Sequence, residues 1–186
     1  MKQKQSKIDE KQLKKQLEQW TGLQYGKIIF DSEKDNWSIK TSVFIDKIIN
    51  KKQLAFIIED TDNEIFGYYL NTEIVEKYCP VETDKYSFEF NLHSNNNRLN
   101  QPKIFPIKNT YNGGYYLHDK NSHRLLYIGD IALFKNDCKE LSYCYQLDNF
   151  DYDGIPQALC GKTGYWDSKV IGESFSLKKF IVVQMN

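Results

Sequence analysis

The sequence predicts an α+β fold that is mainly β, in which a few helices pack around antiparallel sheets. From residue 54 onward, apolar and polar residues alternate in short runs joined by Asp, Asn and Gly turns, which is the pattern of strands and hairpins. Helical spacing of apolar residues occurs only before residue 54. A parallel α/β sheet would need helices regularly interleaved with the strands, and the sequence does not have them.

The first predicted helix covers residues 7–20. Leu13, Leu17 and Trp20 stand at i, i+4 and i+7, which places them on one helical face, and Gly22 follows as a helix-ending residue. This apolar stripe is too short for a long coiled coil. We therefore expect the helix to dock on the body of the protein.

Charge separates the N-terminal segment from the rest of the chain. Lys+Arg and Asp+Glu are both 25, so the net charge is zero, yet residues 1–17 carry six Lys against Asp9 and Glu10. Such a basic helix could also serve as an adaptor to an acidic surface. We divide the chain into a basic amphipathic helix over residues 1–19 and one domain over residues 20–186, which is long enough to bury its own core.

A second helix is predicted over residues 37–52, after a short strand at residues 27–32. Its apolar face would be formed by Ile39, Val43, Phe44 and Ile48. The two lysines at positions 51 and 52 suit the C-terminal end of a helix, where a positive charge is favoured.

Hairpins are predicted for most of the remaining chain. Residues 54–58 and 66–70 each place three apolar side chains on one strand face, and residues 60–64 supply the turn between them. Residues 84–92 alternate Tyr, Phe, Phe and Leu with polar residues, which predicts a strand with one solvent-exposed face. Further strands are predicted within residues 103–109, 114–134, 140–147 and 174–185.

Composition argues against several classes of protein. A net charge of zero lacks the basic field that favours a nucleic-acid partner, so no nucleic acid is expected. No run of 18 apolar residues and no apolar signal core occur, so we expect no membrane insertion and a cytoplasmic location.

The four cysteines are Cys79, Cys138, Cys144 and Cys160. They form no Cys-x-x-Cys pair, so in the cytosol we expect reduced thiols and neither a zinc site nor another metal site. Cys138 stands beside two lysines, at positions 135 and 139, and is the candidate reactive thiol if one exists.

Three other patterns resemble chemical motifs without meeting their requirements. Gly161-Lys162-Thr163 matches the end of a P-loop, but Pro156 stands where the earlier glycine is needed. The acidic stretch at residues 148–154 lacks the ligand spacing of a calcium loop, and we interpret it as a solvated turn. The three histidines, at positions 93, 118 and 123, lack the spacing of a zinc protease and are expected at the surface. No cofactor is expected.

Several aromatic residues could form an exposed recognition surface, because Tyr and Trp provide binding area at a low entropic cost. They are Tyr68, Tyr69, Tyr115, Tyr116 and Trp166. Core packing would explain most of them equally well.

The order of segments over about residues 20–186 resembles the TLDc domain family. The resemblance rests on Tyr-Gly ahead of a helix, the strand LAFIIED, the segment IFGYY at residues 65–69, the strand YSFEFNL and the terminal strand FIVVQM. The family-motif positions are Gly26, Phe66, Gly67, Tyr68, Phe88 and Phe180. A glycine within a strand, as at position 67, lets another backbone or an aromatic ring approach closely.

The resemblance implies a two-sheet antiparallel β-sandwich flanked by helices, a role in resistance to oxidative stress, and a protein partner that in several members is the vacuolar proton ATPase. It brings no catalytic residues. We therefore predict a non-catalytic interaction module. The alternative is an enzyme, such as a thiol-based peroxide scavenger, in which Cys138 has a lowered pKa.

Overall fold

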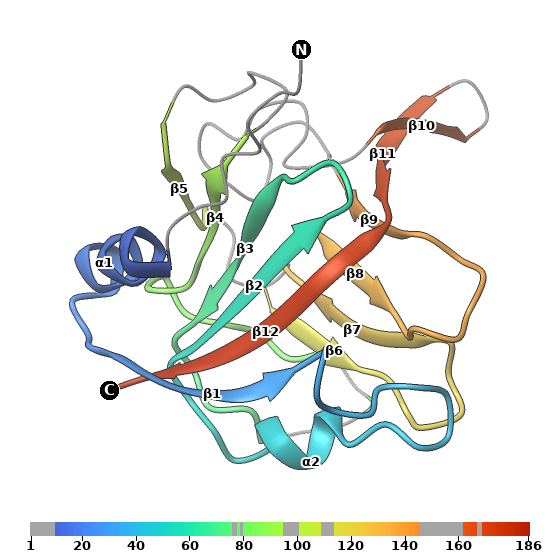
Figure 1. Ribbon diagram of the computed structural model, residues 1–186, viewed down its shortest axis with the longest axis horizontal. Coiled ribbons are helices and arrows are strands. Elements are labelled where there is room, and N and C mark those ends of the chain that lie inside the picture. Colours follow the sequence, from blue (N-terminus) through green and yellow to red (C-terminus); the bar gives the residue numbers. More distant parts are fainter. Residues whose placement is uncertain are drawn as a thin grey trace.

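Two antiparallel sheets packed face to face form the body of the protein (Figure 1). The computed structural model describes residues 10–75, 78, 80–94, 101–108, 114–145, 162–166 and 169–186. Within this part of the chain, each sheet has six strands. The arrangement confirms the predicted mainly β fold and the two-sheet sandwich.

Sheet A lies in front in Figure 1 and has the strand order β1-β12-β2-β3-β4-β5. Its strands are β1 (Tyr25–Asp31), β12 (Leu177–Met185), β2 (Leu54–Asp60), β3 (Ile65–Leu70), β4 (Phe88–His93) and β5 (Lys103–Pro106). Sheet B lies behind it, in the order β10-β11-β9-β8-β7-β6. Its strands are β10 (Lys162–Trp166), β11 (Lys169–Phe175), β9 (Ser142–Tyr145), β8 (Ile131–Phe134), β7 (Arg124–Ile128) and β6 (Tyr115–Leu117).

The last strand in chain order, β12, occupies an interior position of sheet A. The chain crosses from sheet B to sheet A at Ser176, because Phe175 pairs with β9 while Leu177 pairs with β2. Along its length β12 is hydrogen-bonded, in antiparallel pairing, to β2 on one side and to β1 on the other. Sheet A is therefore assembled from distant parts of the sequence.

Apolar side chains cover both faces of sheet A. The inner face packs on sheet B through a core in which the Phe180 ring contacts the rings of both Phe30 and Phe56. The outer face carries a second apolar cluster. Strands that are buried on both faces explain why segments such as LAFIIED are continuous apolar runs in place of strict alternation.

Helix α1 (Glu10–Thr21) covers part of the outer face of sheet A. Within this helix, the Leu17 side chain is fully buried against the sheet, and the Trp20 ring lies against Phe88 and Phe90. Burial of one leucine side chain of this kind contributes about 1.5–3 kcal/mol. The helix ends where Gly22 takes a left-handed φ of 71°. Docking of this helix on the body is thus confirmed for its described residues.

The predicted helix over residues 37–52 is wrong in extent, because only α2 (Phe44–Ile48) is helical. Lys40 has a φ of 68°, which no right-handed helix allows. Contacts with the turn after β8 replace the helical hydrogen bonds: the Ser38 hydroxyl donates to Asn136 Oδ1 at 2.8 Å, and Ile39 N–H donates to Asp137. These tertiary hydrogen bonds override the apolar periodicity.

The strand predicted over residues 84–92 begins later and has no solvent-exposed face. Asp84 accepts hydrogen bonds from the backbone of the next residues and makes a turn, so Tyr86 is exposed and the strand starts at Phe88. The polar side of β4 faces sheet B, where Glu89 is fully buried and accepts a hydrogen bond from Asp130 N–H at 2.7 Å. The Glu89 carboxylate can be buried between the sheets because it accepts this hydrogen bond from a backbone N–H group.

Candidate interaction surface

A groove of about 820 Å³ lies on the outer face of sheet A beside α1. Its floor carries four isoleucines, one from each of four neighbouring strands: Ile28, Ile181, Ile57 and Ile65. Ile57 and Ile181 are direct partners across the β2–β12 ladder, which fixes them on the same face. We call this site, defined by the four residues, the isoleucine groove.

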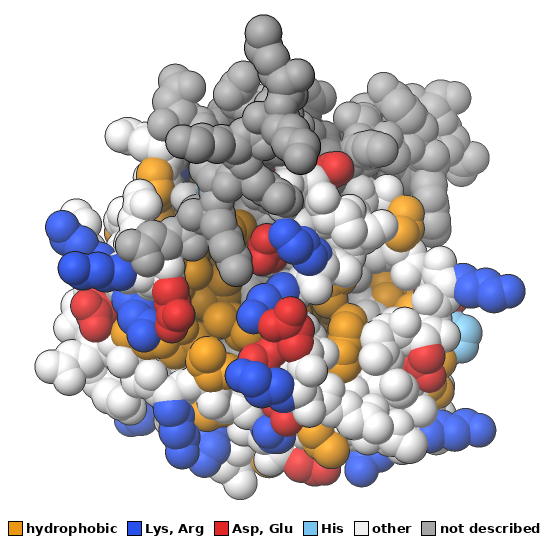
Figure 2. Space-filling model, viewed as in Figure 1, with side chains coloured by type: hydrophobic (Ala, Val, Ile, Leu, Met, Phe, Trp, Pro, Cys, Tyr) orange, Lys and Arg blue, Asp and Glu red, His pale blue; other side chains and the backbone are white. Residues whose placement is uncertain are grey.

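Figure 2 views this face of the molecule and shows hydrophobic side chains that reach the surface between charged ones. Helix α1 shields the part of the sheet next to β3 and β4, while Leu13 and Tyr25 line the end of the groove nearest the helix. Ile28 lies beyond the cover of α1 and is 43% exposed. Ile57 and Ile65 are buried, at 4% and 9% exposure, so among the described floor residues the groove is open mainly at Ile28.

Three lysine–carboxylate pairs form the rim of the groove. They are Lys34–Asp31 at 2.9 Å, Lys178–Glu59 at 2.6 Å and Lys179–Glu33. Exposed pairs of this kind contribute only about 0–1 kcal/mol each to stability. Their main physical effect is to hold charges of both signs around an apolar floor.

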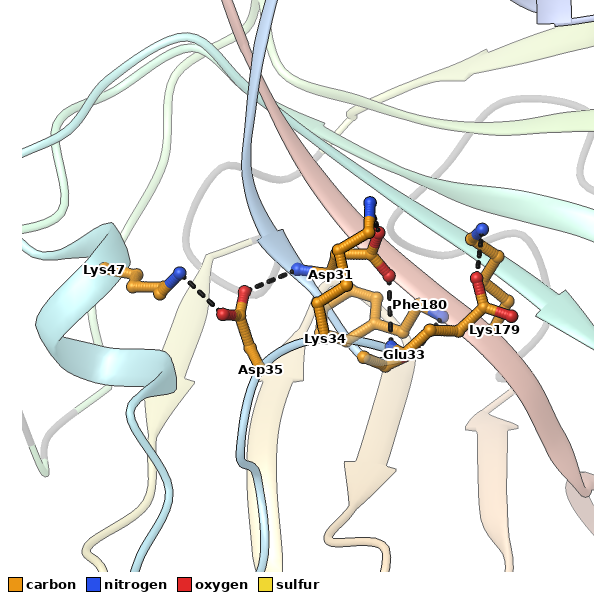
Figure 3. Close-up of polar contacts among 8 residues, drawn as sticks. Asp31, Glu33, Lys34, Asp35, Lys47, Lys179 and Phe180 are labelled. Atoms are coloured by element: carbon orange, nitrogen blue, oxygen red, sulfur yellow. Dashed lines mark hydrogen bonds and ion pairs between the residues drawn. The ribbon is translucent and has the colours of Figure 1, made fainter.

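Figure 3 shows how one side of the rim is held in place by the turn after β1. Asp31 accepts from Glu33 N–H at 3.0 Å, and Asp35 accepts from Asp31 N–H at 2.9 Å. Asp35 also pairs with Lys47 of α2 at 2.7 Å. Burial alone would raise the pKa of Asp31, but the hydrogen bonds from Lys34 and from the Glu33 backbone outweigh it and lower that pKa.

Two groups on the rim and floor have raised pKa values. The hydrogen bond to Glu33 raises the pKa of Lys179, which keeps this lysine charged. Burial, with a smaller effect of Glu10, raises the pKa of Tyr25 to about 12, so its phenol stays neutral. At neutral pH Lys179 therefore adds a positive charge to the rim, while Tyr25 adds a neutral side chain to the groove.

The family-motif positions predicted from the sequence lie in packing positions outside the groove. Phe66, Tyr68 and Phe180 are fully buried in the core between the sheets, and Phe88 lies under α1. At Gly26, a Cβ atom would lie 2.2 Å from the carbonyl oxygen of Gln184 on β12. These residues shape the sheet and do not contribute side chains to the groove.

Gly67 allows the outer face to be packed closely. A Cβ atom at this position would lie 1.8 Å from the carbonyl oxygen of Phe56 on β2 and 2.9 Å from the ring of Phe90 on β4. The Phe90 ring therefore lies over the glycine, and Trp20 of α1 packs on Phe90. Gly67 contributes to the docking of α1 through these two rings, in agreement with the close approach expected from the sequence.

Core packing, one of the two explanations left open for the aromatic residues, is correct for three of them. Tyr68, Tyr69 and Tyr115 are at most 3% exposed, so they belong to the packed interior. Tyr116 is partly exposed and contacts His118. The side chain of Trp166 lies outside the described residues.

Cys138 lacks the electropositive setting that the peroxide-scavenger alternative needs. Burial raises the pKa of its thiol, and the nearby carboxylates of Glu140 and Asp137 raise it further. The thiol donates to the carbonyl of Lys135 at 2.9 Å.

Cys144 is disulfide-bonded, which corrects the expectation that all four cysteines are reduced. Cys79 and Cys160 lie outside the described residues.

The histidines do not come together in a common site. His93 lines the groove, His123 pairs with Glu140 at 2.8 Å at the surface, and burial lowers the pKa of His118 to about 4. In the described part of the chain, no three His, Cys, Asp or Glu side chains are grouped so as to hold a metal ion. Lys162 and Thr163 belong to strand β10 and not to a helix start, while residues 148–154 and Gly161 lie outside the described residues.

Sequence reasoning missed the groove because its four isoleucines are far apart in the chain. The available signal was the continuous apolar run in β2 and the similar run in β12, which indicate strands with two apolar faces. Only one of these faces is used between the sheets. The outer face of sheet A must therefore either be covered by another element, as α1 covers part of it, or remain open to solvent.

Comparison with known proteins agrees with this architecture. The family model for the TLDc domain matches residues 3–156, which includes α1 and ends before β10. A search of curated proteins gave no match. The chain belongs to the TLDc domain family. Among the helices that the structure describes, none is both long enough and apolar enough to cross a membrane.

Proposed function

We propose that this protein is a non-catalytic TLDc interaction module that binds a protein partner through the isoleucine groove. The observation that carries the proposal is an apolar groove on the outer face of sheet A, which is open to solvent mainly at Ile28, at 43% exposure, and is surrounded by a rim of paired charges. An apolar centre within a polar rim is the usual composition of a protein-binding surface.

The family supports the finer parts of the proposal. The partner is a peripheral subunit of the vacuolar proton ATPase, the cellular effect is resistance to oxidative stress, and the protein acts in the cytoplasm without a cofactor. The division into a basic helix over residues 1–19 and a TLDc-like domain over residues 20–186 is also part of this proposal. The role assigned to the groove does not depend on where that boundary falls.

The test is recovery of proton-pump subunits by the tagged protein from a native lysate. The groove variant is Ile28→Glu, which places a charge on the apolar floor at an exposed position. Leu141→Glu is the matched control, because Leu141 is 52% exposed and does not line the groove. A variant of Gly67 would be unsuitable, since the clash at that buried position would disturb the fold.

We expect the wild-type protein and Leu141→Glu to recover peripheral pump subunits and Ile28→Glu to lose them. Circular dichroism and urea midpoints of the purified variants establish that all three proteins are folded. Absence of pump subunits from the wild-type sample would exclude this partner. Equal recovery by Ile28→Glu would exclude the groove as the binding surface.

A further inference from the structure

The buried cysteine of sheet B is joined to a second sulfur of the chain. Cys144 on β9 is fully buried in the core between the sheets and is disulfide-bonded, whereas Cys138 is a free thiol. The chain has four cysteines, so the second sulfur belongs to Cys79 or to Cys160. Both lie outside the described residues, and the described neighbours of each decide between them.

Cys79 is excluded by the width of sheet B. Val81, two residues further along the chain, bridges to Tyr115 at the β6 edge of this sheet. Since β7 and β8 lie between β6 and β9, Val81 is four ladder steps away from Cys144. At the usual strand spacing these steps span about 19 Å, and two residues of chain cover at most about 7 Å of it. The remaining distance is well beyond the roughly 6.8 Å that a disulfide allows between Cα atoms.

Cys160 is within reach by the same measure. Lys162, two residues further along the chain, pairs with Ser174 of β11. Ser174 pairs in turn with Tyr143, which precedes Cys144 on β9. Two ladder steps span about 10 Å, and two residues of chain cover up to about 7 Å of it, which permits the Cα separation of a disulfide. Of the two cysteines, only Cys160 can therefore be joined to Cys144.

A disulfide has a particular meaning in the cytoplasm, where the proposed function places this protein. Glutathione and thioredoxin keep cytosolic thiols reduced, so the disulfides found there are usually transient, with a catalytic or redox-sensing role. We propose that Cys144 and Cys160 are a redox modification site, at which a reversible disulfide forms when peroxide rises and is reduced afterwards by thiol exchange. The inference rests on the proposed function for the cytoplasmic location alone.

Burial assigns the two sulfurs their order in the reaction. Cys144 is fully buried, so peroxide reacts first at the Cys160 thiolate, which attacks one peroxide oxygen. The O–O bond breaks, and a sulfenic acid and one water form. The Cys144 sulfur then attacks the sulfenic sulfur, forms the S–S bond and releases a second water. The two sulfurs lose two electrons in total, and these reduce one hydrogen peroxide to two waters.

The disulfide fastens the edge of sheet B to its interior. Among the described strands, β10 is at the edge of this sheet and pairs with β11 alone, and both reach the periphery of the molecule (Figure 1). A bond between the chain just before β10 and β9 spans β11 and closes a loop of 15 residues, 145–159. Closing such a loop removes entropy from the unfolded chain and so stabilises the oxidised form.

Mass spectrometry of the full-length protein tests the pairing. Free thiols are first blocked with iodoacetamide in the absence of reductant, and the protein is then digested. Trypsin leaves Cys144 and Cys160 together on the peptide of residues 140–162, while Cys79 and Cys138 lie on separate peptides. We expect this peptide to be unblocked and lighter than its reduced form by two hydrogen masses. Chymotrypsin, which cuts at aromatic residues between the two cysteines, should then give fragments that separate only on reduction.

Redox titration tests reversibility and the effect on stability. In glutathione at the ratio found in the cytosol, the disulfide should be absent; hydrogen peroxide should form it, and dithiothreitol should remove it again. The Tm of the oxidised protein should exceed that of the reduced protein by roughly 6–12 °C. Cys160→Ser should abolish this difference, and Cys138→Ser is the matched control that should keep it. Cys160→Ser is preferred to a variant of Cys144, whose burial would make the substitution disturb the core.

The proposal is overturned if the linked peptide contains Cys79 or Cys138, if the disulfide persists in the cytosolic glutathione buffer, or if peroxide does not form it. Equal Tm values in the two redox states would also overturn it, since β10 would then not be fastened. If the disulfide forms and reverses while the tagged protein recovers no pump subunits, the inference stands and the proposed partner fails. If pump subunits are recovered and the disulfide does not respond to peroxide, the proposed function stands and the inference fails.

Discussion

Substitution of Gly67 by alanine tests the packing of sheet A most directly. The added Cβ would lie 1.8 Å from the Phe56 carbonyl oxygen, far inside van der Waals contact, and 2.9 Å from the Phe90 ring. The ring could move aside, but the carbonyl belongs to β2, which is hydrogen-bonded to β3 along its length. Relief of the clash therefore requires the two strands to separate locally.

The expected loss of stability can be set from known costs of overpacking. Extra methyl groups in a packed core cost about 1–3 kcal/mol, and displacement of a paired backbone adds to this, so we expect about 3 kcal/mol or more. This is a large part of the roughly 5–15 kcal/mol that stabilises a typical domain. At about 2–4 °C per kcal/mol for a chain of this size, the Tm should fall by about 6–12 °C.

Urea unfolding, followed by tryptophan fluorescence and circular dichroism, measures the effect. Trp20 is a suitable reporter because its ring packs on Phe90. Gly22→Ala is the control: nothing lies within 4 Å of its added Cβ, but its φ of 71° should cost about 1–2 kcal/mol. If Gly67→Ala lowers the free energy of unfolding no more than Gly22→Ala does, the close-approach argument is refuted.

Three further predictions concern other parts of the molecule. Leu17→Ala should lower the free energy of unfolding by about 2–4 kcal/mol, because it leaves a cavity under α1; a loss below about 1 kcal/mol in urea titrations would show that the helix is not firmly docked. Burial raises the pKa of Asp60 from 3.8 to about 6, so the folded state holds a proton that the unfolded state releases. Stability from this group should be present below about pH 4 and lost as the pH rises through about 6. Asp60→Asn should remove that part of the dependence of urea midpoints on pH, and an unchanged dependence would contradict the assignment. Cys138→Ser should consume peroxide at the wild-type rate, since the pKa of the thiol is raised; a clear loss of consumption would revive the scavenger alternative.

Most strands could be predicted from the sequence, because alternation and turn residues are local signals. The hairpin of β2 and β3 has its apolar residues and its turn within one short segment. The helix predicted around Ile39 failed for a tertiary reason. Side chains of Asn136 and Asp137, distant in sequence, bind the backbone and hydroxyl groups there, and no local pattern could show this.

The candidate site was less predictable than the fold. Ile28, Ile57, Ile65 and Ile181 become neighbours only through the strand order of sheet A, in which β12 lies between β1 and β2. The rim depends in the same way on pairs such as Lys178–Glu59, whose members belong to different strands. The order of segments, the lack of a catalytic motif and the neutral charge led to the prediction of an interaction module, but none of them could locate its surface.

The interior position of β12 has a consequence for the order in which the protein can fold during synthesis. Asp31 of β1 can pair with Ile181 only after the ribosome has synthesised β12. One edge of β2 pairs with β12 as well, so it also stays unpaired until that point. Until then, a growing chain would present two unpaired strand edges, which are prone to join with other chains. Long-range pairing of this kind also slows folding. We therefore expect sheet A to close late, and a chain that stops before β12 to depend on chaperones or to aggregate.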